Sequence, residues 1–269
     1  MKMHEQLRRW YEDYGQLPSI PLWPEGAPGF REEHGQPPPS LAIIQAREGA
    51  GPRRGIILVL PGGGFVTKAP YEGRVVADRF ARDGFDAALL DYRVSPYTQH
   101  DALEDAWQAV RMLHATWEKV AVLGFSAGGH YAALAGTRKP AEDPARPDAV
   151  VVCYSGLSFS SWPPEKSLHE LGGVHTQADR RLLSPERHIG SDTPPFFIWH
   201  TASDQRLHVL YPLGLAAELA KWEIPFELHI YPEGAHGIGL ADGSSPQPAD
   251  AHVGTWIALC QEWLEDRGF

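Results

Sequence analysis

The chain has 269 residues, 43% of them hydrophobic, and its 24 basic and 34 acidic side chains give a formal net charge of −10. A chain of this length can bury a large core, and we expect one domain over residues 1–269. The acidic balance argues against a nucleic-acid partner, because binding phosphates requires a basic face.

The sequence predicts neither a leader nor a membrane segment. Its first ten residues, MKMHEQLRRW, hold no apolar core of a signal peptide, and no run of about 18 apolar residues occurs. Cys153 lies in an apolar run and Cys260 on a late helix, so both are expected to be core residues without a disulfide. We therefore expect a cytoplasmic protein with no membrane partner, and self-association stays open.

The predicted elements indicate an α/β fold. Residues 1–40 are expected to form an extended N-terminal arm, because 18–39 are rich in Pro and Gly. Short apolar runs predict strands at 41–46, 56–60, 87–92, 120–125, 150–154, 196–199 and 226–231. Amphipathic stretches predict helices at 71–83, 101–116, 127–137, 208–222 and 252–266. This alternation predicts a mainly parallel central sheet with helices on both faces. Residues 155–195, between two strands, are expected to form a small helical insertion over the edge of the sheet.

A glycine-rich loop, PGGGF at 61–65, directly follows the strand predicted at 56–60. Loops at the carboxyl ends of parallel strands converge on one edge, and consecutive glycines let backbone N–H groups approach a ligand there. A dinucleotide cradle would need glycine where Thr67 stands, and no P-loop pattern occurs. The loop is therefore interpreted as an oxyanion hole, with donors from Gly63 and Gly64, and a plain tight turn is the alternative.

The segment LGFSAGG at 123–129 matches the nucleophile elbow G-x-S-x-G. It lies between a predicted buried strand and a predicted helix, the context that this motif requires. Gly124 and Gly128 leave room for the sharp turn, and Ser126 would be the nucleophile. The alternative is a βα turn in which the serine caps the helix.

The partners of such a serine are expected in the order acid and then histidine, each after a later strand. Asp204 follows the strand predicted at 196–199, and His236 lies in a glycine-flanked loop after the last strand. Other acids between Ser126 and His236 are less suitable, because they lie beside a proline-rich loop, in a charged stretch or before a strand: Asp143, Asp148, Asp179 and Asp192. Other late histidines begin helices or lie within a strand: His208, His229 and His252.

These residue types together predict acyl transfer. His236 would take the proton of the Ser126 hydroxyl, and Asp204 would fix the imidazole tautomer. The backbone N–H of Ala127, with those of Gly63 and Gly64, would stabilise the oxyanion. No cofactor is expected, and the thirteen histidines predict no metal site because no H-E-x-x-H or close His/Cys pair occurs.

Five segments carry a family resemblance: PLWPEGAPG at 21–29, PGGGF at 61–65, DYRVSP at 91–96, GFSAGGH at 124–130 and AHG at 235–237. Over about residues 17–267, the chain resembles the α/β-hydrolase serine esterases. More narrowly, it is similar to the acetylesterase and acetyl-xylan-esterase-like group, near the hormone-sensitive-lipase-like carboxylesterases. The resemblance places the family's acid and histidine at Asp204 and His236. Lipase-like carboxylesterases open the oxyanion loop with histidine, and Pro61 in that place favours the acetylesterase branch.

The resemblance implies hydrolysis of short acyl esters, with acetylated sugars or xylo-oligosaccharides as substrates. Expected pocket walls are Phe65, Tyr97 and Trp162, each of which could equally be a packing aromatic. His130 is expected to pack beneath the site. Alternatives on the same scaffold are a feruloyl esterase, an arylformamidase or a peptidase, and more distantly a non-catalytic ligand-binding protein.

Overall fold

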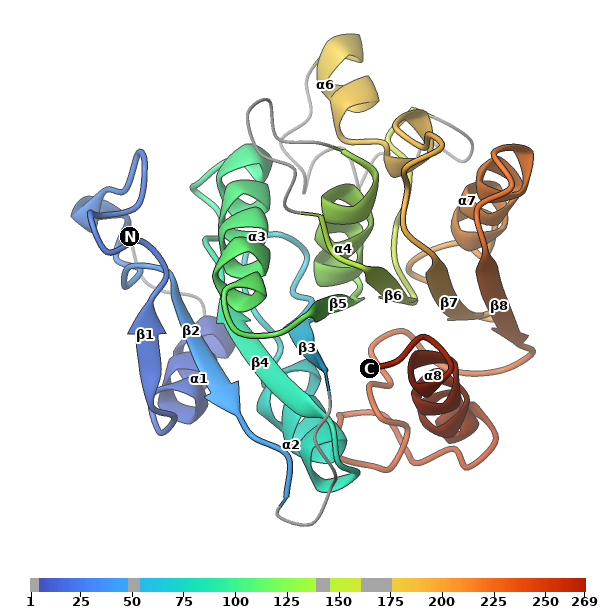
Figure 1. The fold of residues 1–269 in the computed structure, drawn as a ribbon, viewed down its shortest axis with the longest axis horizontal. Helices are drawn as coiled ribbons and strands as arrows, with labels where there is room; N and C mark the ends of the chain where they lie inside the picture. Colours follow the sequence, from blue (N-terminus) through green and yellow to red (C-terminus); the bar gives the residue numbers. More distant parts are fainter. Residues whose placement is uncertain (1–4, 48–53, 139–145, 161–175) are drawn as a thin grey trace.

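An eight-stranded, mainly parallel sheet forms the centre of the molecule (Figure 1). The computed structural model describes residues 5–47, 54–138, 146–160 and 176–269. The strand order is β1-β2-β4-β3-β5-β6-β7-β8. β1 is antiparallel to β2 and β2 to β4, and every other neighbouring pair is parallel. The predicted α/β fold is confirmed.

Each strand and each longer helix predicted from the sequence is present near its predicted bounds. The strands are β1 Ser19–Pro21, β2 Ser40–Ile44, β3 Gly55–Leu60, β4 Asp86–Asp91, β5 Lys119–Phe125, β6 Ala149–Cys153, β7 Phe196–Thr201 and β8 Phe226–Tyr231. The helices are α1 Glu5–Tyr14, α2 Arg74–Arg82, α3 Gln99–His114, α4 Ala127–Thr137, α6 Gln177–Leu182, α7 Leu210–Lys221 and α8 Trp256–Glu265. Short 3-10 turns lie at η1 Glu32–His34, η2 Pro70–Glu72, η3 Pro185–Arg187 and η4 Val253–Thr255. None of the helices in the described ranges is both long and apolar enough to cross a bilayer.

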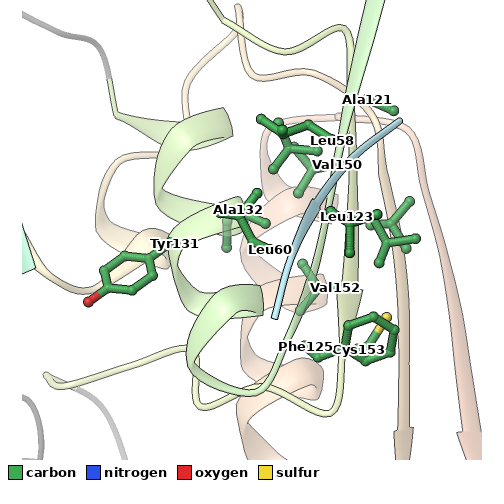
Figure 2. Packing of buried hydrophobic residues seen from close by; sticks show 14 of the residues in the cluster. Leu58, Leu60, Ala121, Leu123, Phe125, Tyr131, Ala132, Val150, Val152 and Cys153 are labelled. Carbon is green, nitrogen blue, oxygen red and sulfur yellow. The ribbon is translucent and has the colours of Figure 1, made fainter. Parts of the chain in front are cut away.

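Helices cover both faces of the sheet, with α3, α4 and α7 on one side and α2 and α8 on the other (Figure 1). Every residue of β3, β6 and β7 is consequently buried, which explains why these strands are almost continuous apolar runs. Figure 2 shows Ala132 of α4 beside Leu60 of β3, where a small side chain lets the helix approach the strands. The nucleophile elbow is thus built between a strand and a helix that are almost completely buried.

Residues 5–14 differ from the extended arm that we expect over residues 1–40, because they form α1. Leu7, Trp10 and Tyr14 recur at helical spacing and are buried against the sheet. The indole N–H of Trp10 donates to the Asp91 carboxylate at 2.8 Å, and that carboxylate also pairs with the buried Lys68 ammonium. The apolar side chains at helical spacing and the buried hydrogen bond of Trp10 therefore favour a helix here, although the neighbouring residues 18–39 are rich in Pro and Gly.

The insertion expected over residues 155–195 is described only in part, since residues 161–175 lie outside the described ranges. The described part contains α6 and η3, and η3 lies against α4 and α7. This portion therefore flanks the helices on one face of the sheet.

The register of the parallel strands brings their carboxyl ends to one edge. Leu60 at the end of β3 pairs with Gly124 of β5, and Phe125 pairs with Cys153 at the end of β6. Cys153 in turn pairs with Trp199 of β7. The loops that follow β3, β5, β6, β7 and β8 therefore meet, although they are far apart in the sequence.

Candidate active site

Ser126 occupies a strained turn between β5 and α4. Its backbone has φ 49° and ψ −117°, a conformation that costs about 1–3 kcal/mol for a residue with a side chain. A Cβ at Gly124 would lie 2.2 Å from the Gly128 carbonyl oxygen, and one at Gly128 would lie 2.1 Å from the Leu60 carbonyl oxygen. Both glycines of the motif are thus required by close backbone contacts.

Ser126, His236 and Asp204 form a hydrogen-bonded chain. Ser126 Oγ lies 3.0 Å from His236 Nε2, and His236 Nδ1 lies 2.8 Å from Asp204 Oδ2. An ionised carboxylate can only accept, so the Nδ1 atom carries the proton and Nε2 is left to accept from the serine hydroxyl. The structure therefore brings together the three residues that the sequence analysis selects, in the tautomer that proton abstraction needs.

The Asp204 carboxylate is held ionised by its surroundings. Burial raises its pKa, but hydrogen bonds from His236, Leu207 and Arg206 and the charge of His236 outweigh burial and lower it below the ordinary value. Its Oδ1 atom accepts the backbone N–H groups of Arg206 at 2.7 Å and Leu207 at 2.9 Å. Because these bonds fix one oxygen, the other oxygen is directed at the imidazole.

Three backbone N–H groups in the glycine loop and directly after Ser126 have no hydrogen-bond partner among the described residues. They are the N–H groups of Gly63, Gly64 and Ala127. Gly63 and Gly64 have positive φ values of 145° and 60°, which favour glycine. A Cβ at Gly64 would meet no atom within 4 Å, so this glycine borders open space. Unpaired N–H groups of this kind are available to an oxyanion, the role that the sequence analysis predicts for them.

A buried carboxylate, Glu72, connects the glycine loop to the histidine loop. Glu72 is 2% exposed and accepts the Gly62 N–H at 2.8 Å and the Tyr154 hydroxyl at 2.6 Å. The Tyr154 oxygen in turn accepts the Gly239 N–H at 3.0 Å, and the Tyr154 ring meets the His236 ring edge-on with centroids 5.2 Å apart. Burial raises the pKa of Glu72, although both hydrogen bonds and the charge of His236 oppose it.

The sequence analysis missed this network. Glu72 lies in a short turn with no motif, so no pattern could have identified it. Tyr154 comes directly after β6, at the edge where reactive groups gather, and that position was a usable signal. His200 was also missed; its Nε2 lies 2.8 Å from the Leu207 carbonyl oxygen and 3.7 Å from Asp204 Oδ2, and burial lowers its pKa.

We expect Tyr154→Phe to lower the free energy of unfolding by about 1–3 kcal/mol, because it leaves the buried Glu72 oxygen and Gly239 N–H unpaired. Urea denaturation measures this loss. Tyr231→Phe is the matched control, since the Tyr231 hydroxyl has one partner, Thr255, near the surface. Equal losses in both variants would contradict the bridging role of Tyr154.

Two of the three expected pocket walls, Phe65 and Tyr97, are described, and both are largely buried. Phe65 is buried, with its ring against His130, Tyr131 and Phe159. Tyr97 is also buried, and its hydroxyl donates to the Arg31 carbonyl at 3.0 Å. These contacts fit the packing role that was the alternative, and neither residue lines the two cavities described below. Trp162 falls within residues 161–175, outside the described ranges.

His130 packs beneath the site, as expected. It is fully buried, its Nδ1 lies 2.9 Å from the Gly156 carbonyl oxygen, and burial lowers its pKa to about 4. It is therefore neutral at physiological pH and has no access to a substrate.

A cavity of about 950 Å³ opens beside His236. Its lining is mostly polar: Tyr71, Ser203, Gln205, Arg206, Glu233, Gly234, Ala235, His236 and Gln247. A substrate group placed here would lie next to the imidazole that transfers the proton. A hydroxyl, an imidazole and a carboxylate hydrogen-bonded in this order can support nucleophilic attack on a carbonyl carbon.

Comparison with known proteins places the chain among α/β hydrolases. The family model BD-FAE matches residues 41–219. The crystal structure of an acetyl ester-xyloside bifunctional hydrolase from Caldicellulosiruptor lactoaceticus is 35% identical, with a TM-score of 0.81 over 95% of this chain and 99% of the other. An esterase of Thermogutta terrifontis, solved with its tabun adduct, is 26% identical, with a TM-score of 0.70 over 86% of this chain and 90% of the other.

Among curated proteins, an acetylxylan esterase of Xylanibacter ruminicola is 27% identical over 227 residues, which are 79% of this chain and 44% of that protein. The chain spans about half the length of the curated relatives that it matches. Those relatives thus contain further sequence with no counterpart in this chain.

Proposed function

Since the chain belongs to the BD-FAE family of α/β hydrolases, we propose that it is a serine carboxylesterase of short acyl esters, above all acetyl esters of sugars or xylo-oligosaccharides. The observation that carries the proposal is the chain of hydrogen bonds from Ser126 through His236 to Asp204. The N–H groups of Gly63, Gly64 and Ala127, which have no partner among the described residues, support the proposal as donors for the oxyanion.

In the proposed reaction, Ser126 Oγ attacks the ester carbonyl carbon while its proton passes to His236 Nε2. The carbonyl oxygen becomes an oxyanion, which Gly63, Gly64 and Ala127 stabilise by about 3 kcal/mol per donor. The ester C–O bond then breaks, and the imidazolium gives its proton to the departing alcohol. Water, deprotonated by the same imidazole, releases the acyl group and restores the serine.

The names of similar proteins support an acetyl group and a sugar alcohol as the two parts of the substrate ester. They include an acetyl ester-xyloside hydrolase and an acetylxylan esterase. The tabun adduct of the Thermogutta esterase supports a nucleophilic serine, because organophosphates react with activated serine hydroxyls.

A substrate panel tests this function. We expect p-nitrophenyl acetate and acetylated xylosides to be hydrolysed with kcat/KM at least about tenfold above that for p-nitrophenyl octanoate, since each misplaced methylene can cost 1–3 kcal/mol. Methyl ferulate, N-formylkynurenine and a peptide amide complete the panel. A preference for any of these three over the acetyl esters would replace the proposal with the corresponding alternative.

A further inference from the structure

A second cavity, of about 760 Å³, adjoins the cavity beside His236. Tyr71 lines both cavities. The loop at 244–247 also borders both, since Ser244, Ser245 and Pro246 line the second and Gln247 lines the first. Tyr71 and the 244–247 loop thus border both cavities, and the two cavities taken together, from His236 to α1, are called the groove below.

The position of His236 in the groove indicates where the departing alcohol would lie. The imidazole must hand its proton to the departing alcohol, so that alcohol lies next to His236 during catalysis. The first cavity contains His236 and the residues that follow Asp204. A leaving alcohol larger than this cavity would extend past Tyr71 into the second.

The lining of the groove suits a ligand with many hydroxyl groups. Ligand pockets are usually lined mainly by apolar side chains. Here Gln205, Arg206 and Gln247 lie in the first cavity, and Arg9 and Asp13 in the second. These side chains offer both donors and acceptors, which hydroxyl groups need because each hydroxyl both donates and accepts.

The second cavity also has apolar surface, and its charged side chains make only weak ion pairs within the protein. Pro70, Val75 and Pro246 provide surface for the C–H faces of a sugar ring. Arg9 pairs with Glu5 at 2.8 Å, but both side chains are about 70% exposed, and such a pair holds its partners only weakly. Asp13 is 3.9 Å from Arg74, so neither α1 side chain is committed to a strong internal contact.

We propose that this groove binds an oligosaccharide alcohol, with one subsite between His236 and Tyr71 and a distal subsite formed by α1, Pro70 and the 244–246 loop. The proposal rests on the proposed esterase function. It adds that α1 is part of the substrate site and that the enzyme prefers an acetylated oligomer to an acetylated single sugar.

Chain-length kinetics on matched variants test the proposal. Wild type is expected to hydrolyse mono-acetylated xylotriose with kcat/KM about tenfold above that for mono-acetylated methyl β-xyloside, the effect of one to two added hydrogen bonds. The double variant Arg9→Ala/Asp13→Ala is expected to lose most of this preference. The control Arg8→Ala/Glu12→Ala removes one basic and one acidic side chain from exposed positions of the same helix that do not line the groove, and should keep the preference.

Hydrolysis of p-nitrophenyl acetate separates this proposal from the esterase function. Wild type and the control Arg8→Ala/Glu12→Ala should hydrolyse that substrate at equal rates, because its alcohol does not reach α1. Equal kcat/KM for the trisaccharide and the xyloside in wild type, or equal losses in both double variants, would overturn the distal subsite while leaving the esterase intact. Absence of activity on every acetyl ester would overturn the esterase function itself.

Discussion

Replacement of Ser126 by Ala is expected to reduce kcat on an acetyl ester by about 10⁴- to 10⁶-fold, the largest effect of any single change in this chain. The hydroxyl that forms the acyl-enzyme is lost, and the remaining groups can only assist direct attack by water. His236, Asp204 and the backbone donors would persist, so weak residual hydrolysis above the uncatalysed rate is expected. KM should change much less than kcat, because ester binding does not depend on the Oγ atom.

Stopped assays with p-nitrophenyl acetate measure the loss, and fluorophosphonate labelling followed by peptide mapping locates the nucleophile. Ser191→Ala is the control, since Ser191 is exposed and lies before β7, at the edge opposite to the site. Wild type and the control should be labelled at Ser126. Turnover by Ser126→Ala within about tenfold of wild type, or labelling of another serine, would refute an acyl-enzyme at this position.

The sequence was most informative where geometry forces a residue type. A Cβ at Gly124 or Gly128 of the elbow would lie little more than 2 Å from a carbonyl oxygen, so only glycine fits at either position. The short motif therefore predicts the turn. Asp204 and His236 were predictable for a different reason, namely that each follows a strand and parallel strands end at one edge. Both inferences need only local pattern and topology.

Glu72 and the groove along α1 were not predictable by such reasoning. Glu72 acts through contacts with residues 10 and 82 positions away, and a buried glutamate leaves no periodic signal. The groove depends on α1 and on Tyr71 and the 244–247 loop, which border both cavities. The sequence analysis did not predict α1, because the segment that follows it is rich in Pro and Gly. Long-range packing determines both features.

Asp204→Asn is expected to lower kcat by about 10⁴-fold, the size of effect seen when a triad carboxylate becomes an amide. The amide can turn its NH₂ group toward His236 Nδ1, and Nδ1 would then accept while the proton moves to Nε2. In that tautomer the imidazole cannot take the Ser126 proton, although all three side chains keep their places. The backbone donors Arg206 and Leu207 favour this outcome, because they hold the other position of the side chain for an oxygen acceptor.

Asp192→Asn is the matched control, since Asp192 lies before the same strand and its pairing with Arg146 is half-exposed. Its kcat should stay within about twofold of wild type, because exposed ion pairs contribute little. A slower rate of fluorophosphonate labelling in Asp204→Asn, with an unchanged unfolding midpoint, would separate loss of serine activation from loss of structure. A kcat near that of wild type in Asp204→Asn would show that another residue is the orienting acid. His200 could not be that residue, although its Nε2 lies 3.7 Å from the Asp204 carboxylate. Burial lowers the pKa of His200, and a neutral imidazole has no negative charge to stabilise the imidazolium.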